Sequence, residues 1–175
     1  MKKIIFIILA VTTVSVMNDL TKENIKIPKE AIRFRVIANS DSNSDQQIKK
    51  NVAKNLEKTV FNSLSNTNSL NDTRKDIENN LDLYKEVIDN TLKENDCNMN
   101  YEINYGKNYF PSKSYRGLTY KEGEYESLVV TIGKGEGQNF WCVLFPPLCL
   151  IDEDKTDSEY HFLVKDLINK YLKNN

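Results

Sequence analysis

The side chains best suited to chemistry in this chain are two cysteines seven positions apart, Cys142 and Cys149. Between them stand Pro146 and Pro147, which must end the preceding apolar strand because proline cannot donate to a strand ladder. A disulfide across this turn would close a small loop and stabilise the fold by about 2 kcal/mol. The alternative is two buried free thiols, which behave as small hydrophobic side chains. If the bridge forms, Cys97 is expected to remain a free thiol.

An acidic turn early in the chain has the spacing of the first ligands of a calcium loop: Asp41, Asn43 and Asp45. That motif also requires glycine where Gln46 stands and glutamate where Val52 stands, so the match fails. The single histidine and the three cysteines fit no zinc pattern. We therefore predict neither a metal site nor a cofactor.

A glycine-rich segment, residues 133–137, is predicted to be a hairpin connection. A phosphate cradle needs a following helix, and here a strand follows. The chain has no Gly-x-Ser-x-Gly elbow and no His-Glu-x-x-His pair, which favours a binding or signalling protein over an enzyme. The alternative is a secreted hydrolase of cell wall or sugar that uses two carboxylates as acid and base.

Hydrophobic periodicity predicts the elements that must position these residues. Their order, β-α-α-β-β-β-β-α, indicates an α+β fold with one largely antiparallel sheet and three helices packed on it. The strand 140–145 is apolar on both faces and is predicted to be central. The first helix is expected to be capped by Ser44 with Gln47. The predicted strands cover 32–38, 99–105, 115–121 (a strand or a loop), 124–132 and 140–145, and the predicted helices 44–64, 72–95 and 158–173.

The N-terminus has the pattern of an export signal, with Lys2 and Lys3 before an apolar run. We predict a signal peptide or short N-terminal anchor over 1–17, a polar linker over 18–30 and a single domain over 31–175. The run is shorter than the roughly 20 apolar residues of a spanning helix. Contact with a membrane is therefore expected only through this segment, if it is not cleaved. A net charge of −1 and a pI of about 5.9 give no indication of nucleic-acid binding.

Five segments in order along the domain make the chain resemble the stage II sporulation protein R family of endospore-forming Firmicutes. The longest and most unusual joins a tryptophan-containing apolar strand to the double proline and both neighbouring cysteines. The segments are Ile32–Ser42, Asn108–Pro111, Glu122–Leu128, Gly133–Gly135 and Asn139–Cys149. One departure is Phe140, where the family often has a second tryptophan.

The resemblance implies a secreted signalling protein of sporulation and not an enzyme. Members look like forespore proteins exported into the space between the forespore and mother-cell membranes. There they activate a membrane-embedded aspartic protease of the mother cell, which processes pro-sigma-E. The catalytic aspartates would then belong to the partner. From motif position and expected exposure, the candidate partner-binding residues are Asn39, Ser40, Asp41, Tyr109, Phe110, Pro146 and Pro147.

Overall fold

The computed structural model describes residues 27–65, 67, 69–115, 118–150 and 156–173. The predicted signal segment and most of the predicted linker lie outside these residues. In chain order the elements are β1 (Ile32–Ile37), α2 (Asn43–Leu64), α3 (Leu70–Asn79), α4 (Leu81–Glu94), β2 (Tyr101–Phe110), β3 (Lys113–Tyr115), β4 (Leu118–Tyr120), β5 (Gly123–Ile132), β6 (Asn139–Phe145), a 3-10 turn (Leu148–Leu150), α5 (Asp157–Ile168) and a final π-helical turn (Asn169–Lys173). The predicted α+β class is confirmed. No helix in the described part of the chain is long and apolar enough to cross a membrane.

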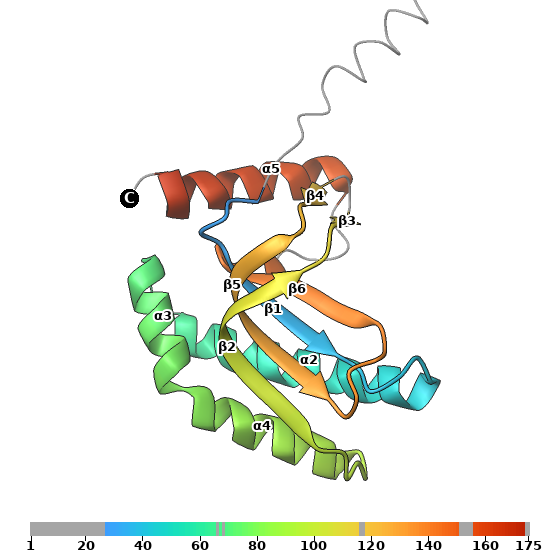
Figure 1. Cartoon of the computed structure of the whole chain (residues 1–175). Coiled ribbons are helices and arrows are strands. Elements are labelled where there is room, and N and C mark those ends of the chain that lie inside the picture. The colour runs from blue at the N-terminus through green and yellow to red at the C-terminus, as the bar shows by residue number, and fades with distance from the viewer. Residues whose placement is uncertain (1–26, 66, 68, 116–117, 151–155, 174–175) are drawn as a thin grey trace, which may run out of the picture.

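The main sheet of the described residues is mixed, with the strand order β2-β5-β1-β6. β1 pairs in parallel with β5, while the β1–β6 and β2–β5 pairs are antiparallel. The prediction of a largely antiparallel sheet is therefore confirmed for the β1–β6 and β2–β5 pairs. The parallel β1–β5 pair was not predicted. A parallel pair needs a long crossover. The chain between β1 and β5 provides it, because it contains three helices (Figure 1).

The predicted central position of the strand 140–145 is wrong, because β6 lies at the edge of the sheet. Its apolar character has another cause, since both of its faces are covered. On the side of α2, the ring of Phe140 lies edge-on to Phe34 with 5.8 Å between ring centroids. On the other side, Val143 is buried under α5 with Val164 and Ile168.

The main core lies between the sheet and the helices α2, α3 and α4 (Figure 1). β1 contributes Phe34 and Val36, which are fully buried, and α2 contributes Val52 and Leu56 at helical spacing. Burial of each such side chain stabilises the fold by about 1.5–3 kcal/mol. Because side chains alternate along a strand, β1 directs Arg33 to the opposite side of the sheet.

Two helix boundaries differ from the prediction. The N-cap of α2 is Ser42, not Ser44, since the Ser42 hydroxyl accepts a hydrogen bond from the backbone of Asp45 at 3.1 Å. The single helix predicted over 72–95 is two helices that meet at Asn80. The Asn80 amide donates to the carbonyl of Asp76 at 2.8 Å, a local bond of the kind that competes with helix propagation. Within the segment predicted as a strand or loop over 115–121, Tyr115 ends β3 and Leu118–Tyr120 form β4, and these two short strands pair antiparallel.

A carboxylate on β5 ties α3 to the sheet. Arg74 donates to both oxygens of Glu126, with Nη2 at 2.8 Å from Oε2, and the Tyr105 hydroxyl donates to Oε1 at 2.7 Å. Burial opposes ionisation of Glu126, but the hydrogen bonds from Arg74 and Tyr105 outweigh it and lower the pKa of its carboxyl. The charged form is therefore the one that stabilises the fold.

We expect Glu126→Gln to lower the free energy of unfolding by about 1–2 kcal/mol at pH 7, because it weakens charge-assisted bonds at a partly exposed site. A lowered pKa gives stability that is present above the unfolded pKa and lost as the pH falls through the folded pKa. The difference between wild type and variant should therefore shrink below about pH 4. Urea unfolding from pH 7 to pH 3 measures it, with Glu124→Gln, an exposed neighbour on β5, as the control. A difference that is independent of pH would contradict this role.

Candidate partner-binding site

The predicted contact residues after β1 form a turn that is held together by Asp45. Oδ2 of Asp45 accepts from the Ser40 hydroxyl at 2.6 Å and from the Asn39 amide at 2.8 Å. These bonds lower the pKa of the Asp45 carboxyl from its ordinary value. The Asn39 oxygen accepts from the backbone of Lys134 at 3.0 Å, which joins the turn to the loop between β5 and β6. Asn39 and Ser40 are thus half-buried structural residues.

Asp41 is the exposed member of this turn. Its Oδ1 accepts from the backbone of Gln138 at 2.7 Å and from the Gln46 amide at 3.3 Å. Lys49 lies beneath them and donates to the Gln46 side chain at 2.6 Å and the Gln138 carbonyl at 3.2 Å. The Asp41 carboxylate is therefore the group that this turn presents to solvent.

Two glycines allow the β5–β6 loop to approach this turn. Gly133 has φ = +58°, and a Cβ there would collide with the side chain of Asn39. A Cβ on Gly137 would collide with the backbone carbonyl of Ser40. The glycine-rich segment is the predicted hairpin connection, and its composition follows from close contact with a turn about ninety-five positions earlier.

Tyr109 and Phe110 point in different directions, as neighbours in a strand must. Tyr109 is 58% exposed and remains available to a partner. Phe110 is only 1% exposed, so the exposure on which its choice as a contact residue rested is not found. Its ring packs edge-on against Trp141 at 5.1 Å and Tyr125 at 6.2 Å between centroids.

The contact between Phe110 and Trp141 shows that the sheet curls. β2 and β6 are opposite edges of the sheet, with two strands between them. In a flat sheet such edges lie about 14 Å apart. The ring contact at 5.1 Å requires the far end of β2 to fold over the side of the sheet away from α2, here called the outer face. The curl therefore buries the ring of Phe110, although the position of this residue in the sequence had suggested an exposed side chain.

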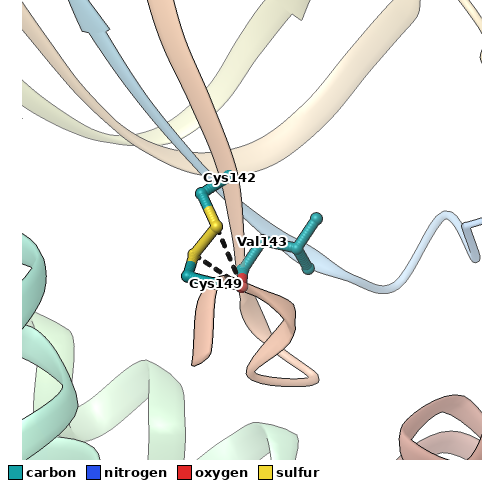
Figure 2. The surroundings of a disulfide bond; sticks show 3 residues. All are labelled: Cys142, Val143 and Cys149. Atoms are coloured by element: carbon teal, nitrogen blue, oxygen red, sulfur yellow. Dashed lines mark hydrogen bonds between the residues drawn. A yellow bond between two sulfur atoms is a disulfide. The ribbon is translucent and has the colours of Figure 1, made fainter. Parts of the chain in front are cut away.

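The proline turn leaves β6 at the other end of the sheet from the Asn39 turn. Pro146 is buried and Pro147 half-buried, and the peptide bond before Pro146 is cis. Cys142 and Cys149 form the disulfide that the sequence left open, with 5.6 Å between their Cα atoms. Figure 2 shows the bridge beside the Val143 carbonyl, whose oxygen lies 3.1 Å from Sγ of Cys149. Cys97 is free.

The bridge also lies near Glu57 on α2. One carboxylate oxygen and the two sulfur atoms lie within 4.8 Å of one another, as the ligands of a metal ion would. The sulfur atoms are bonded to each other, however, and a metal needs thiolates. The group therefore has no metal-binding role while the bridge is intact.

Sequence reasoning missed a group of cations and rings on the outer face, which we call the outer cluster (Arg33, Arg35, Phe110, Tyr125 and Trp141). The guanidinium carbon of Arg33 lies 3.3 Å from the centroid of the Tyr125 ring, and Arg33 is only 3% exposed. The guanidinium carbon of Arg35 lies 4.7 Å from the centroid of the Trp141 ring. Burial lowers the pKa of both arginines. The sequence feature that could have indicated the outer cluster is the presence of two arginines, Arg33 and Arg35, at alternate positions of a core strand.

The structure does not unite the predicted contact residues in one site. The Asn39 turn follows Ile37 at one end of β1, and Pro146 lies beyond Ile32 at the other, a strand length of about 20 Å. The outer cluster lies between the two ends. Of the residues predicted to contact a partner, Asp41 and Tyr109 are exposed, Asn39, Ser40 and Pro147 are half-buried, and Phe110 and Pro146 are buried.

Comparison of the sequence with known proteins places the chain in a family. The family model of stage II sporulation protein R matches residues 28–155. The chain belongs to the stage II sporulation protein R family. It is 35% identical over 153 residues to the stage II sporulation protein R of Bacillus subtilis (strain 168), which covers 85% of this chain and 68% of that relative. No solved structure matches the chain.

Four of the five segments that resemble the stage II sporulation protein R family are brought together in two pairs by the fold. The segment Ile32–Ser42 contacts Gly133–Gly135 through Asn39 and Lys134. The segment Asn108–Pro111 contacts Asn139–Cys149 through Phe110 and Trp141. These two contacts join segments that are distant in the sequence.

We expect reduction of the disulfide to lower the free energy of unfolding by about 2 kcal/mol, because the bridge closes a short loop and restricts the unfolded chain. Denaturant unfolding with and without reductant should show this loss in the wild type and in Cys97→Ser. Cys149→Ser should already have lost this stability and should not respond to reductant. If the wild type is equally stable with and without reductant, the assignment of a stabilising Cys142–Cys149 disulfide is contradicted.

Proposed function

We propose that this chain is an exported signal of sporulation that activates a membrane-embedded aspartic protease of the mother cell, which then processes pro-sigma-E. The observation that carries the proposal is membership of the stage II sporulation protein R family over residues 28–155. The chain would act in the space between the forespore and mother-cell membranes. It would act by binding and not as an enzyme.

Two features of the chain support action outside the cytoplasm. Residues 1–17 have the charge and apolar pattern of an export signal. The Cys142–Cys149 bridge is of the kind that persists in oxidising compartments. Both features fit a protein that is made in one cell and acts on the membrane of another.

Activation by binding requires the chain to prefer one state of the protease. A ligand shifts an equilibrium only by the difference between its affinities for the two states. A rigid surface suits this role, since little ordering free energy is lost on binding. The turn of Asn39, Ser40 and Asp41 is rigid in this sense, because its side chains are tied to α2 and to the β5–β6 loop.

The proposal predicts the outcome of co-expression in a non-sporulating bacterial host. Cleavage of pro-sigma-E, followed by immunoblot, should require the protease together with this chain. Removal of residues 1–17 should abolish cleavage while the chain still accumulates, because the domain would stay on the wrong side of the membrane. Cleavage in the absence of the chain, or none in its presence, would contradict the proposal.

The same assay separates the signalling function from the hydrolase alternative. A surface hollow of about 550 Å³ at the end of α4 is lined by Asp89, Asp96 and other residues, and it is a place where two carboxylates could act as acid and base. Signalling predicts that the double variant Asp89→Asn, Asp96→Asn still supports cleavage of pro-sigma-E. Loss of function in a variant that still unfolds cooperatively would favour the hydrolase.

A further inference from the structure

The outer face holds three cations that have no carboxylate partner among the described residues. Arg33, Arg35 and Lys113 form no ion pair with any carboxylate of the described residues. The chain as a whole has a net charge of −1, so this concentration of positive charge is local. A surface of this kind attracts negatively charged groups from solvent.

The cations are held in place by aromatic rings. Arg33 is buried between Tyr125 and Phe110, and its Nε has no hydrogen-bond partner. Ring faces stabilise a cation but leave its charge in place. Arg33 therefore adds a fixed positive charge below the surface, where the low dielectric strengthens its effect on an anion above it.

Two of the cations can be reached from solvent. Arg35 is half-buried and Lys113 is exposed. The guanidinium carbon of Arg35 lies 4.7 Å, and Nζ of Lys113 5.1 Å, from the same Trp141 ring centroid. The two charges are therefore no more than about 10 Å apart. Alternate side chains of an extended peptide lie about 7 Å apart on one face, so two carboxylates of such a peptide can reach both cations.

The edge of the sheet next to these charges favours a peptide as the ligand. β6 is an edge strand, and no strand of the described residues pairs with its outer side. Its first residues, Asn139–Trp141, are only half-buried. An edge strand offers backbone N–H and C=O groups to an added strand, and pairing would place the added side chains beside Trp141.

We propose that this part of the outer face binds an acidic, extended peptide segment of a partner protein. The segment pairs with the first half of β6 and directs carboxylates at alternate positions to Arg35 and Lys113. Arg35 also donates from Nη1 to the Tyr109 carbonyl at 3.3 Å and from Nη2 to the Asn139 side chain at 3.1 Å, so a carboxylate of the segment binds the remaining N–H hydrogens of the guanidinium. This inference rests on the geometry of the outer face and holds whether or not the partner is a protease.

Trp141 provides the test, because it is the only tryptophan of the chain and lies within the surface. The probe is a ten-residue peptide of alternating Thr and Glu, titrated into the purified chain while Trp141 fluorescence is recorded. We expect a saturable change that the matched Thr-Gln peptide does not produce. Arg35→Gln or Lys113→Gln should weaken binding about threefold to tenfold, and Lys85→Gln on α4 should leave it unchanged.

Each outcome of these binding experiments either supports or overturns the inference. Lys113 is exposed, so Lys113→Gln should fold normally, and Arg35→Lys should retain part of the affinity by keeping the charge. No response to the Thr-Glu peptide, equal binding of the Thr-Gln peptide, or full affinity in Lys113→Gln would overturn the inference. A response to phosphatidylglycerol vesicles without one to the peptide would also overturn it, and would assign the face to an anionic membrane. If the Thr-Glu peptide does not bind, the outcome expected in the co-expression assay with the protease does not change.

Discussion

The structure depends on the central position of β1, whose two faces have different neighbours. One face inserts Phe34 and Val36 into the core beneath α2, and the other holds Arg33 against aromatic rings. β1 pairs in parallel with β5 and antiparallel with β6, so it fixes the register of both. Because strand side chains alternate, a one-residue shift of β1 would put arginine into the apolar core and expel phenylalanine from it.

The surfaces proposed for function follow from this constraint. The end of β1 leads into the Asn39 turn, which is tied to the β5–β6 loop through Lys134. The middle of β1 supplies Arg33 and Arg35 to the outer cluster. Since β6 is bonded to β1 in register, Trp141 lies opposite Arg35. The charged surface and its edge strand are therefore consequences of one strand pairing.

Much of the fold could be predicted from the sequence, because local patterns determine local structure. The alternation in β1 and β5 and the stripe of α2 predicted the corresponding elements. The parallel pair could not be predicted, since periodicity does not say which strands meet. The break at Asn80 depends on one side-chain bond within a continuous apolar stripe. The edge position of β6 was missed because burial on both faces is the same signal for a central strand and for an edge strand covered on both sides.

The candidate site could be predicted only in part, because it also depends on contacts between distant parts of the chain. The Cys142–Cys149 bridge has a local signal in spacing and intervening prolines, although spacing alone left it open. Phe110 was misjudged because its burial depends on the curl that brings two sheet edges together. Arg33 is a charged residue of an alternating strand, a type that usually faces water, yet rings from β2 and β5 bury it. Tertiary contacts decide such positions.

We propose that the protein signals by binding a membrane-embedded partner and that the outer face takes part in this contact, and site-specific photo-crosslinking during sporulation tests the proposal most directly. A benzoylphenylalanine would replace Ser112, which is exposed beside Lys113, or Leu83, which is 42% exposed on α4. The account predicts an adduct with the epitope-tagged aspartic protease from position 112 and none from position 83. An adduct from position 83 alone would contradict it.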